Sequence, residues 1–340
     1  MQIQVIQTLT ELNALQAGWN ALLDESAMRV PFLRHEYLTT WWETRGGGEW
    51  PEAELYVVTA RDPSGQLVGI APLFQTTNLE GQPALMFLGS IEISDYLDFI
   101  ARPEQMAPFL EALIAHLQQP EAPRWEVIDL YNVLESSPSL EILPALANQL
   151  GLKFEQQQLQ PAPYLDLPPD FETYLAGLDK KQRHEIRRKM RRAESGEAEV
   201  RWYIVDDETR LDAEIDAFLR LMATSPEKDE FLTDVMRTQM RRSVHAAFQA
   251  GWLQLAMMEI NGEKAAAYLN FDFNNQIYVY NSGLNWDFGY YSPGWVMLAY
   301  LVQWAIENGR TMLDLMRGDE EYKYRFGGVN RYVYRVQIRS

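Results

Sequence analysis

The order of sequence patterns along this chain occurs twice, and this internal repeat constrains the fold more than any single motif. In the first half, 54-ELYVVTARDPSGQLVGIAPLFQ-75 has two apolar, β-branched runs around a turn sequence, which predicts a β-hairpin. The second half contains 253-LQLAMMEINGEKAAAYLNFDF-273, which has the same form. Aligning Gly262 with Gly65 superposes the two hairpins without a gap. The sequence therefore predicts two copies of one structural unit.

The elements around each hairpin match as well. Helices precede each hairpin, and a strand, a helix and another strand follow it, so we expect an α/β (α+β) fold in which each unit is a mixed, mostly antiparallel sheet flanked by helices. Prolines cluster in 158-QLQPAPYLDLPPD-170, which predicts units at 1–160 and 161–340. The expected helices are 8–24, 35–45 and 104–118, then 171–194, 208–223, 230–250 and 293–308, and the later expected strands are 84–89, 125–132, 277–284 and 311–318.

The residue types present exclude several kinds of site. The chain has no cysteine, which rules out disulfides, thiolate metal sites and a cysteine nucleophile. Its four histidines are far apart in the sequence, and none has a second ligand at metal-binding spacing. We therefore expect no metal site.

The charge distribution is uneven. A formal net charge of −18 disfavours general binding to nucleic acid or anionic membranes. Against this background, 179-DKKQRHEIRRKMRRAESG-196 holds eight Lys or Arg between Lys180 and Arg192 and one acid, Glu185. Three interpretations stay open for this basic helix: a solvated face balanced by acids, an anchor for phosphates, or a docking surface for an acidic carrier protein, tRNA or anionic lipid.

We expect no transmembrane segment. The most apolar run, 294-GWVMLAYLVQWAIENG-309, has about 15 helical residues, whereas crossing a bilayer takes roughly 20. The first 20 residues lack the basic start and the apolar run of a signal peptide, which favours a cytoplasmic protein.

Three segments carry a resemblance to a known family: 179-DKKQRHEIRRKMRR-192, 292-SPGWVMLAYLVQWAIENG-309 and 314-DLMRGDEEYKYRFG-327. They resemble the CelD-type (cellulose-biosynthesis-associated) family of GNAT acyltransferases, which is similar to the Fem transferases that build peptidoglycan bridges from two fused GNAT-like units. The resemblance implies transfer of an acyl group from acyl-CoA or acetyl-CoA to an amine or similar acceptor. The implied acceptor is a small molecule or a cell-envelope precursor, and exopolysaccharide or cell-envelope metabolism is the implied setting.

The resemblance also implies a place for the donor. The pyrophosphate of the cofactor is expected at the start of the 293–308 helix, beside Ser292, Pro293, Gly294 and Trp295, because free N–H groups and the helix dipole attract an anion there. The GNAT pattern has several glycines at this entrance, whereas 288-FGYYSPGW-295 has one directly at the helix. Coenzyme A, an acyl carrier protein and aminoacyl-tRNA therefore stay open as donors. Arg183 and Arg187 of the basic helix are the further candidate phosphate contacts.

The first unit is expected to lack a donor site, because 100-IARPEQM-106 has no glycine and opens with acidic Glu104. It is expected to be non-catalytic and to shape the acceptor pocket. Asp95, Tyr96 and Asp98 lie where its strand gives way to a loop, and two carboxylates beside an aromatic ring suit a cationic amine. The alternative is that they are ordinary turn residues.

Lys323 is the first candidate for catalysis. The matching lysine of the Fem family lies at the catalytic centre, and an ammonium group there would stabilise the oxyanion that forms on acyl transfer. The alternative is a surface lysine paired with Glu320 or Glu321. Asp314 lies among apolar strand residues, so it needs a partner such as Arg317 or Lys323 and is expected to orient other groups.

The predicted central strands supply further candidates. GNAT enzymes use a strand carboxylate to deprotonate the amine and a tyrosine to protonate the leaving thiolate, which suggests Glu259 and Tyr280. Asn281 is a candidate for substrate binding. The alternatives are a turn acid and a packing tyrosine. Two other functions stay open for the whole chain: a Fem-like transferase that uses aminoacyl-tRNA, and a non-catalytic binding module on the same fold.

Overall fold

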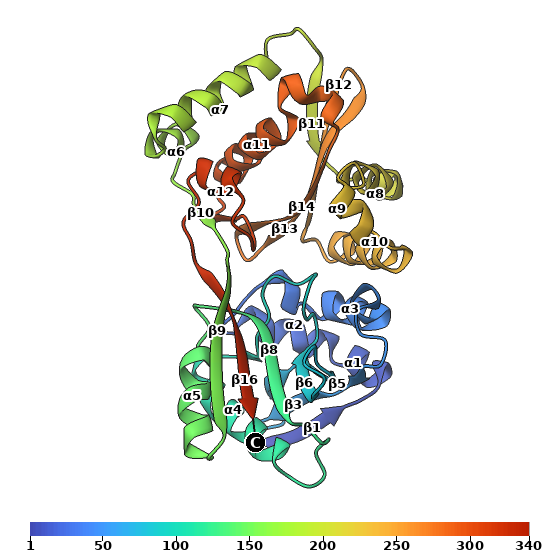
Figure 1. Ribbon diagram of the computed structural model, residues 1–340, viewed down its shortest axis with the longest axis vertical. Coiled ribbons are helices and arrows are strands. Elements are labelled where there is room, and N and C mark those ends of the chain that lie inside the picture. The colour runs from blue at the N-terminus through green and yellow to red at the C-terminus, as the bar shows by residue number, and fades with distance from the viewer. Residues whose placement is uncertain (340) are drawn as a thin grey trace. The chain divides into compact units, whose positions relative to one another are not determined.

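The computed structural model describes residues 1–339, which form two compact units (Figure 1). Unit 1 comprises Met1–Pro161 together with residues 331–339, and unit 2 comprises Ala162–Asn330. The sequence placed the whole of 161–340 in one unit. The structure differs at the C-terminal end, where β16 (Tyr332–Arg339) pairs with strands of unit 1.

Unit 2 is built on one six-stranded sheet in the order β10-β15-β14-β13-β12-β11. All neighbours are antiparallel except β14 and β15, which are parallel. This is the mixed, mostly antiparallel sheet that the sequence predicts. Its strands are β10 (Tyr164–Asp166), β11 (Val200–Ile204), β12 (Leu253–Ile260), β13 (Glu263–Phe273), β14 (Gln276–Leu284) and β15 (Met312–Asp314).

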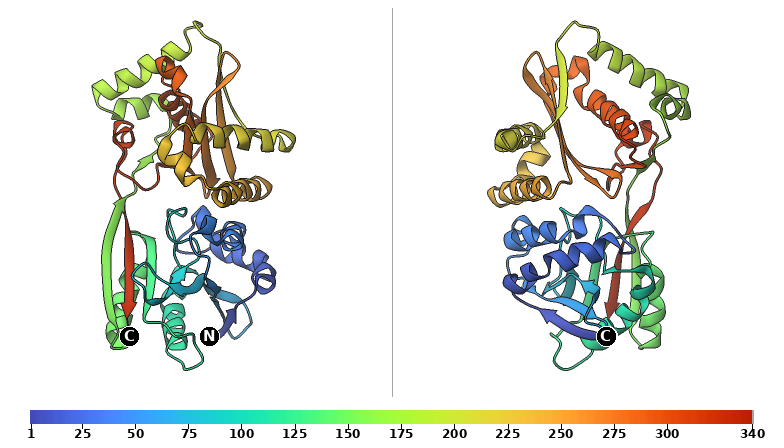
Figure 2. Two further views of the ribbon diagram at one scale, coloured as in Figure 1. Left: turned by 45° about the vertical axis from the view of Figure 1, so that its right-hand side comes forward. Right: turned by 180° about the vertical axis from the view of Figure 1, so that it is seen from behind.

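Helices cover both faces of this sheet (Figure 2). One face carries α6 (Phe171–Gly177), α7 (Lys180–Ala193), α11 (Pro293–Glu307) and α12 (Glu321–Arg325), and the short helix η2 (Trp286–Tyr291) leads into α11. The other face carries α8 (Glu208–Met222), α9 (Pro226–Phe231) and α10 (Asp234–Gln249).

The expected helix 171–194 is two helices. Leu178 has extended backbone angles, and the Asp179 side chain accepts hydrogen bonds from Lys181 N and Gln182 N at 2.8 and 3.0 Å. A second N-cap inside the segment therefore starts a new helix. The new helix, α7, buries Ile186, Met190 and Ala193 in the core beside α11.

Unit 1 has two sheets, ordered β1-β3-β4-β7 and β2-β5-β6-β8-β16-β9. The expected helix 8–24 is divided at Leu15 into two helices. The strands are β1 (Gln2–Ile6), β2 (Glu54–Leu55), β3 (Val57–Arg61), β4 (Leu67–Ala71), β5 (Leu73–Thr77), β6 (Pro83–Phe87), β7 (Ile100–Ala101), β8 (Val127–Leu134) and β9 (Lys153–Pro161). The helices are α1 (Leu9–Ala14), α2 (Gln16–Asp24), η1 (Pro31–Leu33), α3 (His35–Gly48), α4 (Pro103–Leu117) and α5 (Ser139–Gln149).

The two units repeat one topology. In each, a helix of 15 residues that begins with proline lies in the connection between two parallel strands: α4, after the short β7, between β6 and β8, and α11 between β14 and β15. The long strand β13 corresponds to β4 and β5 together, which Pro72 separates because proline cannot donate a strand hydrogen bond. The predicted repeat is confirmed at the level of the fold.

The C-terminal strand is fixed in unit 1 by a buried ion pair. β16 lies between β8 and β9 (Figure 1). Arg335 of β16 donates to both carboxylate oxygens of Asp129 on β8, at 2.8 and 2.7 Å, and Asp129 has no exposed surface. Val336, Gln337 and Ile338 are all buried, as expected for a strand in the interior of a sheet.

Candidate functional site

The candidate site lies beside the part of β14 that extends past the end of β15. The two strands pair from Gln276–Met312 to Tyr278–Asp314, and β14 then continues to Leu284 after β15 has ended. A cavity of about 330 Å³ opens beside this part of β14. Its walls come from the sheet (Tyr268, Ser282, Leu284), the approach to α11 (Asn285, Trp286, Gly289), the start of α11 (Ser292, Pro293, Gly294, Trp295, Leu298) and α12 with the residue after it (Tyr322, Phe326).

The predicted donor-binding residues meet at this cavity. Ser292 has a left-handed backbone (φ 52°), Pro293 begins α11, and within the described residues no side chain caps this helix start. The first turn therefore has N–H groups available to an anion. The side chain that approaches Gly294 is Leu284 of β14, because a Cβ added at Gly294 would lie 2.9 Å from Leu284 Cδ2. Gly294 thus also lets α11 pack closely on the sheet.

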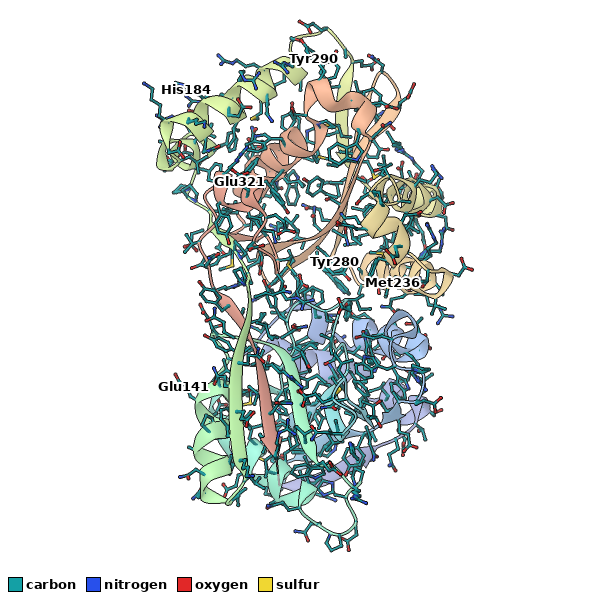
Figure 3. The ribbon with its side chains drawn as sticks, in the orientation of Figure 1. Glu141, His184, Met236, Tyr280, Tyr290 and Glu321 are labelled. Carbon is teal, nitrogen blue, oxygen red and sulfur yellow. The ribbon has the colours of Figure 1, made fainter. Side chains whose placement is uncertain are left out.

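A β-bulge in β14 decides which side chains face the cavity. Leu269 pairs with Asn281 but Asn270 pairs with Val279, so Tyr280 is the extra residue. The Tyr280 ring stacks on Phe271 at a centroid distance of 5.2 Å, on the sheet side covered by α10 (Figure 3). Ser282 lines the cavity on the opposite side. The structure therefore separates Tyr280 from the predicted donor-binding residues.

Two cations of α7 adjoin the cavity wall. Lys189 Nζ lies 4.3 Å from the ring centroid of Trp295, and Arg192 lies 4.5 Å from that of Tyr290 and donates to its carbonyl at 2.8 Å. Burial lowers the pKa of Lys189, although Glu185 acts in the opposite direction. The sequence analysis did not single out these two residues. Lys189 and Arg192 are three residues apart in the sequence and flank the buried residues of α7, and this spacing could have indicated that both lie on one side of the helix.

The predicted phosphate contacts of α7 lie elsewhere. Arg187 forms an ion pair with Glu172 of α6, and Arg183 donates to the carbonyl of Ala176 at 3.3 Å. Both side chains are therefore turned toward α6. Of these four cations, Lys189 contacts a residue that lines the cavity, Trp295.

Lys323 is a buried lysine, with 2% of its surface exposed. Its Nζ donates to the carbonyls of Met316, Arg317 and Gly318 at 3.1, 2.7 and 3.3 Å and lies 2.9 Å from Glu320 Oε2. An ammonium group has three N–H donors. These contacts use all of them, so the side chain secures the loop after β15 in this structure.

Asp314 supports the same loop. It has no exposed surface, and its Oδ1 accepts a hydrogen bond from Met316 N at 2.9 Å. Met316 has a left-handed backbone (φ 64°), which is unusual for a residue with a side chain. Tyr322, the neighbour of Lys323 on α12, lines the cavity. Asp314 and Lys323 thus brace the loop that leads to the helix behind the cavity wall.

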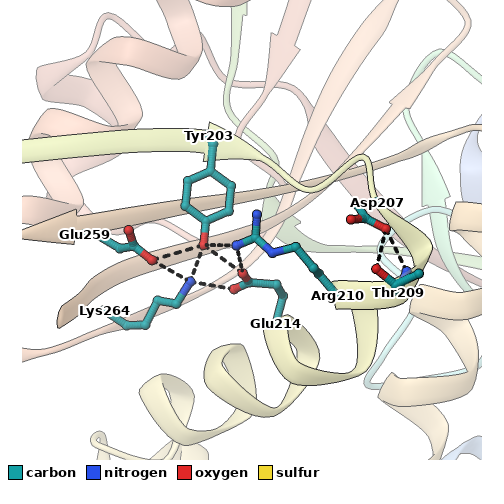
Figure 4. Close-up of polar contacts among 7 residues, drawn as sticks. All are labelled: Tyr203, Asp207, Thr209, Arg210, Glu214, Glu259 and Lys264. Atoms are coloured by element: carbon teal, nitrogen blue, oxygen red, sulfur yellow. Dashed lines mark hydrogen bonds and ion pairs between the residues drawn. The ribbon is translucent and has the colours of Figure 1, made fainter. Parts of the chain in front are cut away.

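Glu259 belongs to a separate polar network (Figure 4). Lys264 Nζ lies 3.0 Å from Glu259 and 2.6 Å from the buried Glu214, and the Tyr203 hydroxyl oxygen lies 2.7 Å from Glu214 Oε1 and 3.2 Å from Glu259 Oε1. Burial acts to raise the pKa of Glu259, but Lys264 outweighs it, and the pKa is lowered. A carboxylate with a lowered pKa is a weak base, and Glu259 does not line the cavity. This geometry disfavours the predicted role as general base.

Asn281 faces a lysine that the sequence analysis did not single out. Its Oδ1 accepts from Lys228 Nζ at 2.9 Å and from Ser282 N at 2.8 Å, and Lys228 also donates to the carbonyl of Ser282. Burial lowers the pKa of Lys228, and the charge of Glu320 opposes this shift. Asn281 therefore orients the strand next to a residue that lines the cavity. Its role in substrate binding stays a prediction.

The acceptor candidates of unit 1 are turned inward. Tyr96 and Asp98 are each 1% exposed, and Asp95 is 9% exposed. Asp98 Oδ1 accepts from Ser139 Oγ at 2.6 Å and from Phe99 N at 2.8 Å. Burial raises the pKa of Asp98 to about 6, although its hydrogen bonds act to lower it. In this structure neither Tyr96 nor Asp98 offers open surface to an amine.

Comparison with known proteins supports the fold described above. A family model described as an acetyltransferase (GNAT) domain matches residues 180–324, which include all the cavity-lining residues except Phe326. The solved structure of FemX is similar, with a TM-score of 0.65, 12% identity, and coverage of 98% of this chain and 97% of that chain. The chain folds into two tandem GNAT-like units. A search of curated protein sequences found no match.

Two further solved structures are similar to this chain over almost the full length. A conserved protein of unknown function from Bacteroides thetaiotaomicron VPI-5482 has a TM-score of 0.61 and 14% identity, with 100% of both chains covered. L-PGS from Bacillus licheniformis has a TM-score of 0.56 and 12% identity, with coverage of 95% of this chain and 91% of that chain. Within residues 1–339, none of the helices has the length and apolar character that a bilayer crossing demands.

Proposed function

We propose that unit 2 transfers an acyl group from a thioester to an amine. The observation that carries this proposal is the cavity beside the part of β14 that extends past the end of β15, bordered by the uncapped first turn of α11. A thioester on a pantetheine arm has a thin, largely apolar shape and an anionic end. The cavity suits the arm, and the helix start suits the phosphate.

The edge of β14 offers main-chain contacts to the donor. Because β15 ends at Asp314, the part of β14 beyond Tyr278 has no strand partner on that side among the described residues. Main-chain groups along this edge can pair with the amides of a pantetheine arm, as a sheet edge pairs with an added strand. This would hold the thioester carbonyl in one orientation.

The proposed reaction mainly requires that the amine and the thioester be held in position, because the thioester is already activated. The amine nitrogen attacks the thioester carbonyl, a C–N bond forms, the C–S bond breaks, and the thiol leaves with the proton that the amine gives up. Tyr322 and Ser282 bring hydroxyl groups to the cavity wall. Burial raises the pKa of Tyr322, which keeps its O–H protonated and able to donate to the developing oxyanion.

We assign Lys323 and Asp314 a positioning role in this reaction, because their contacts secure the loop before α12. Lys323 would reach an oxyanion only after releasing one of its carbonyl partners. We propose that unit 1 shapes the acceptor pocket and binds no donor, since its α4 begins next to acidic Glu104. The cell-envelope setting rests on the family resemblance alone.

Calorimetric binding of acetyl-CoA and of longer acyl-CoAs, followed by an assay for thiol release with a panel of amines, tests the proposal. Ser282→Phe should fill the cavity and weaken binding at least tenfold, because Ser282 lines it. Ser136→Phe, at an exposed position of unit 1, is the matched control and should bind normally. Binding without turnover on any amine would instead favour the non-catalytic module.

A second donor has support from one observation. Trp286 and Tyr290 are 66% and 59% exposed beside the cavity, and Arg192 lies over the Tyr290 ring. Exposed aromatic rings next to cations can stack on nucleotide bases. A Fem-like transfer from aminoacyl-tRNA would use such a surface. Aminoacyl-tRNA that binds more tightly than acyl-CoA, with amino-acid transfer, would establish this alternative.

A further inference from the structure

We propose that the outer face of α7 docks an acidic carrier protein, which presents the acyl thioester on its phosphopantetheine arm to the cavity. This inference rests on the proposed function of unit 2. The outer face is defined by the exposed residues of the helix. They are Lys180, Lys181, His184, Arg188 and Arg191.

The charge of this face is only partly balanced. Within residues 1–339, ion pairs reach α7 from two carboxylates: Glu172 pairs with Arg187, and Glu185 pairs with Arg188 and Lys189. Arg191 donates to the carbonyl of Arg187, a contact that leaves its charge uncompensated. A solvated face whose charges are balanced by acids therefore describes Arg187, Arg188 and Lys189 but not Arg191.

The helix that carries the outer face lies next to the cavity. The inner side of α7 packs on α11, and Lys189 and Arg192 contact Trp295 and Tyr290 at the cavity and its rim. Figure 3 shows His184 pointing away from the sheet and Tyr290 beside the C-terminal end of α7. A partner seated on the outer face would therefore hold its prosthetic arm close to the cavity.

The overall charge favours a small acidic partner over a large polyanion. The chain has a net charge of −18, although α7 supplies eight Lys or Arg between Lys180 and Arg192. An RNA or a membrane surface would extend beyond α7 and meet the negative remainder. A small acidic protein can engage one helix while that remainder repels other orientations.

The cavity entrance also suits a single phosphate. Coenzyme A brings a pyrophosphate and a 3′-phosphate, whereas a carrier-bound arm brings one phosphodiester. Gly294 is the one glycine directly at the start of α11, and Leu284 occupies the space beside it. The first turn can meet one phosphate without the glycine-rich loop that close approach of a pyrophosphate requires.

Calorimetric titration with a purified holo-acyl carrier protein tests the docking surface. We expect Lys181→Glu combined with Arg191→Glu to weaken carrier binding at least tenfold, because both positions are exposed on the outer face. The matched control reverses two exposed charges of unit 1, Arg124→Glu and Lys153→Glu, and should bind as the wild type does. Absent binding, or an equal affinity of both double variants, would overturn the proposal.

Transfer from S-acyl pantetheine, which has no carrier, separates this inference from the proposed function. The α7 double variant should keep the wild-type rate with S-acyl pantetheine and lose at least tenfold in kcat/KM with acyl carrier protein. Carrier binding that depends on α7, without any transfer, would refute the proposed function and keep the docking surface. Binding of tRNA that depends on α7, without carrier binding, would overturn the inference.

Discussion

Asp314 and Lys323 hold opposite ends of one residue, Met316. Asp314 Oδ1 accepts from Met316 N–H at 2.9 Å, and Lys323 Nζ donates to the Met316 carbonyl at 3.1 Å. Met316 has a left-handed backbone, so its conformation depends on such partners. This arrangement connects the end of β15 to α12, whose Tyr322 lines the cavity.

Lys323→Ala should therefore destabilise unit 2 as well as impair transfer. Loss of the ammonium leaves three buried carbonyls without their donor, and we expect a cost of about 3 kcal/mol in the free energy of unfolding. Arg325→Ala removes an exposed ion pair from the same helix and should cost about 0.5 kcal/mol or less. Urea unfolding compares the two. A fully stable Lys323→Ala variant without activity would instead indicate direct catalysis.

Asp98 should make stability depend on pH. Burial raises its folded-state pKa to about 6 from an ordinary value of 3.8. The folded state therefore favours the protonated carboxyl group, and the stability that this preference contributes is fully present below about pH 4 and is lost as the pH rises through about 6. Relative to Asp98→Asn, the wild type should lose about 2 kcal/mol between pH 4 and pH 7. Urea unfolding at both pH values measures this, and parallel behaviour of the two proteins would refute the assignment.

Three glycines of unit 2 should respond differently to alanine. A Cβ at Gly283 would lie 2.5 Å from the backbone N of Met222, and one at Gly294 would lie 2.9 Å from the flexible end of Leu284. We expect Gly283→Ala to cost about 3 kcal/mol and Gly294→Ala about 1 kcal/mol. Gly289 has open space around it, so Gly289→Ala is the control. Thermal unfolding should reproduce this order, and equal losses at Gly283 and Gly289 would contradict the packing described.

Local patterns predicted the repeated hairpins, the helices that begin at Pro103 and Pro293, and the gathering of Ser292, Pro293, Gly294 and Trp295 at one place. These features depend on residues that are close in the sequence. The division at Leu178 was also encoded locally, since Asp179 is an N-cap residue. We expected one continuous helix because the apolar stripe runs through that point.

The remaining features depend on contacts between distant segments. β16 pairs with β8 and β9 across a separation that no local pattern reveals. The network around Glu259 includes Tyr203 and Glu214, which come from other segments of the chain. A β-bulge in β14 places the Tyr280 side chain on the face of the sheet away from the cavity. Lys189 and Arg192 gained their position from the packing of α7 on α11, which the sequence of α7 alone does not specify.

The most direct test of the central claim is the affinity of unit 2 for an acyl thioester, measured by calorimetry with S-acyl pantetheine on the full chain. Ser282 lines the cavity beside the part of β14 that extends past β15. The account predicts that the wild type binds and that Ser282→Phe loses at least tenfold in affinity. No binding by the wild type, or equal affinities for both proteins, would contradict it.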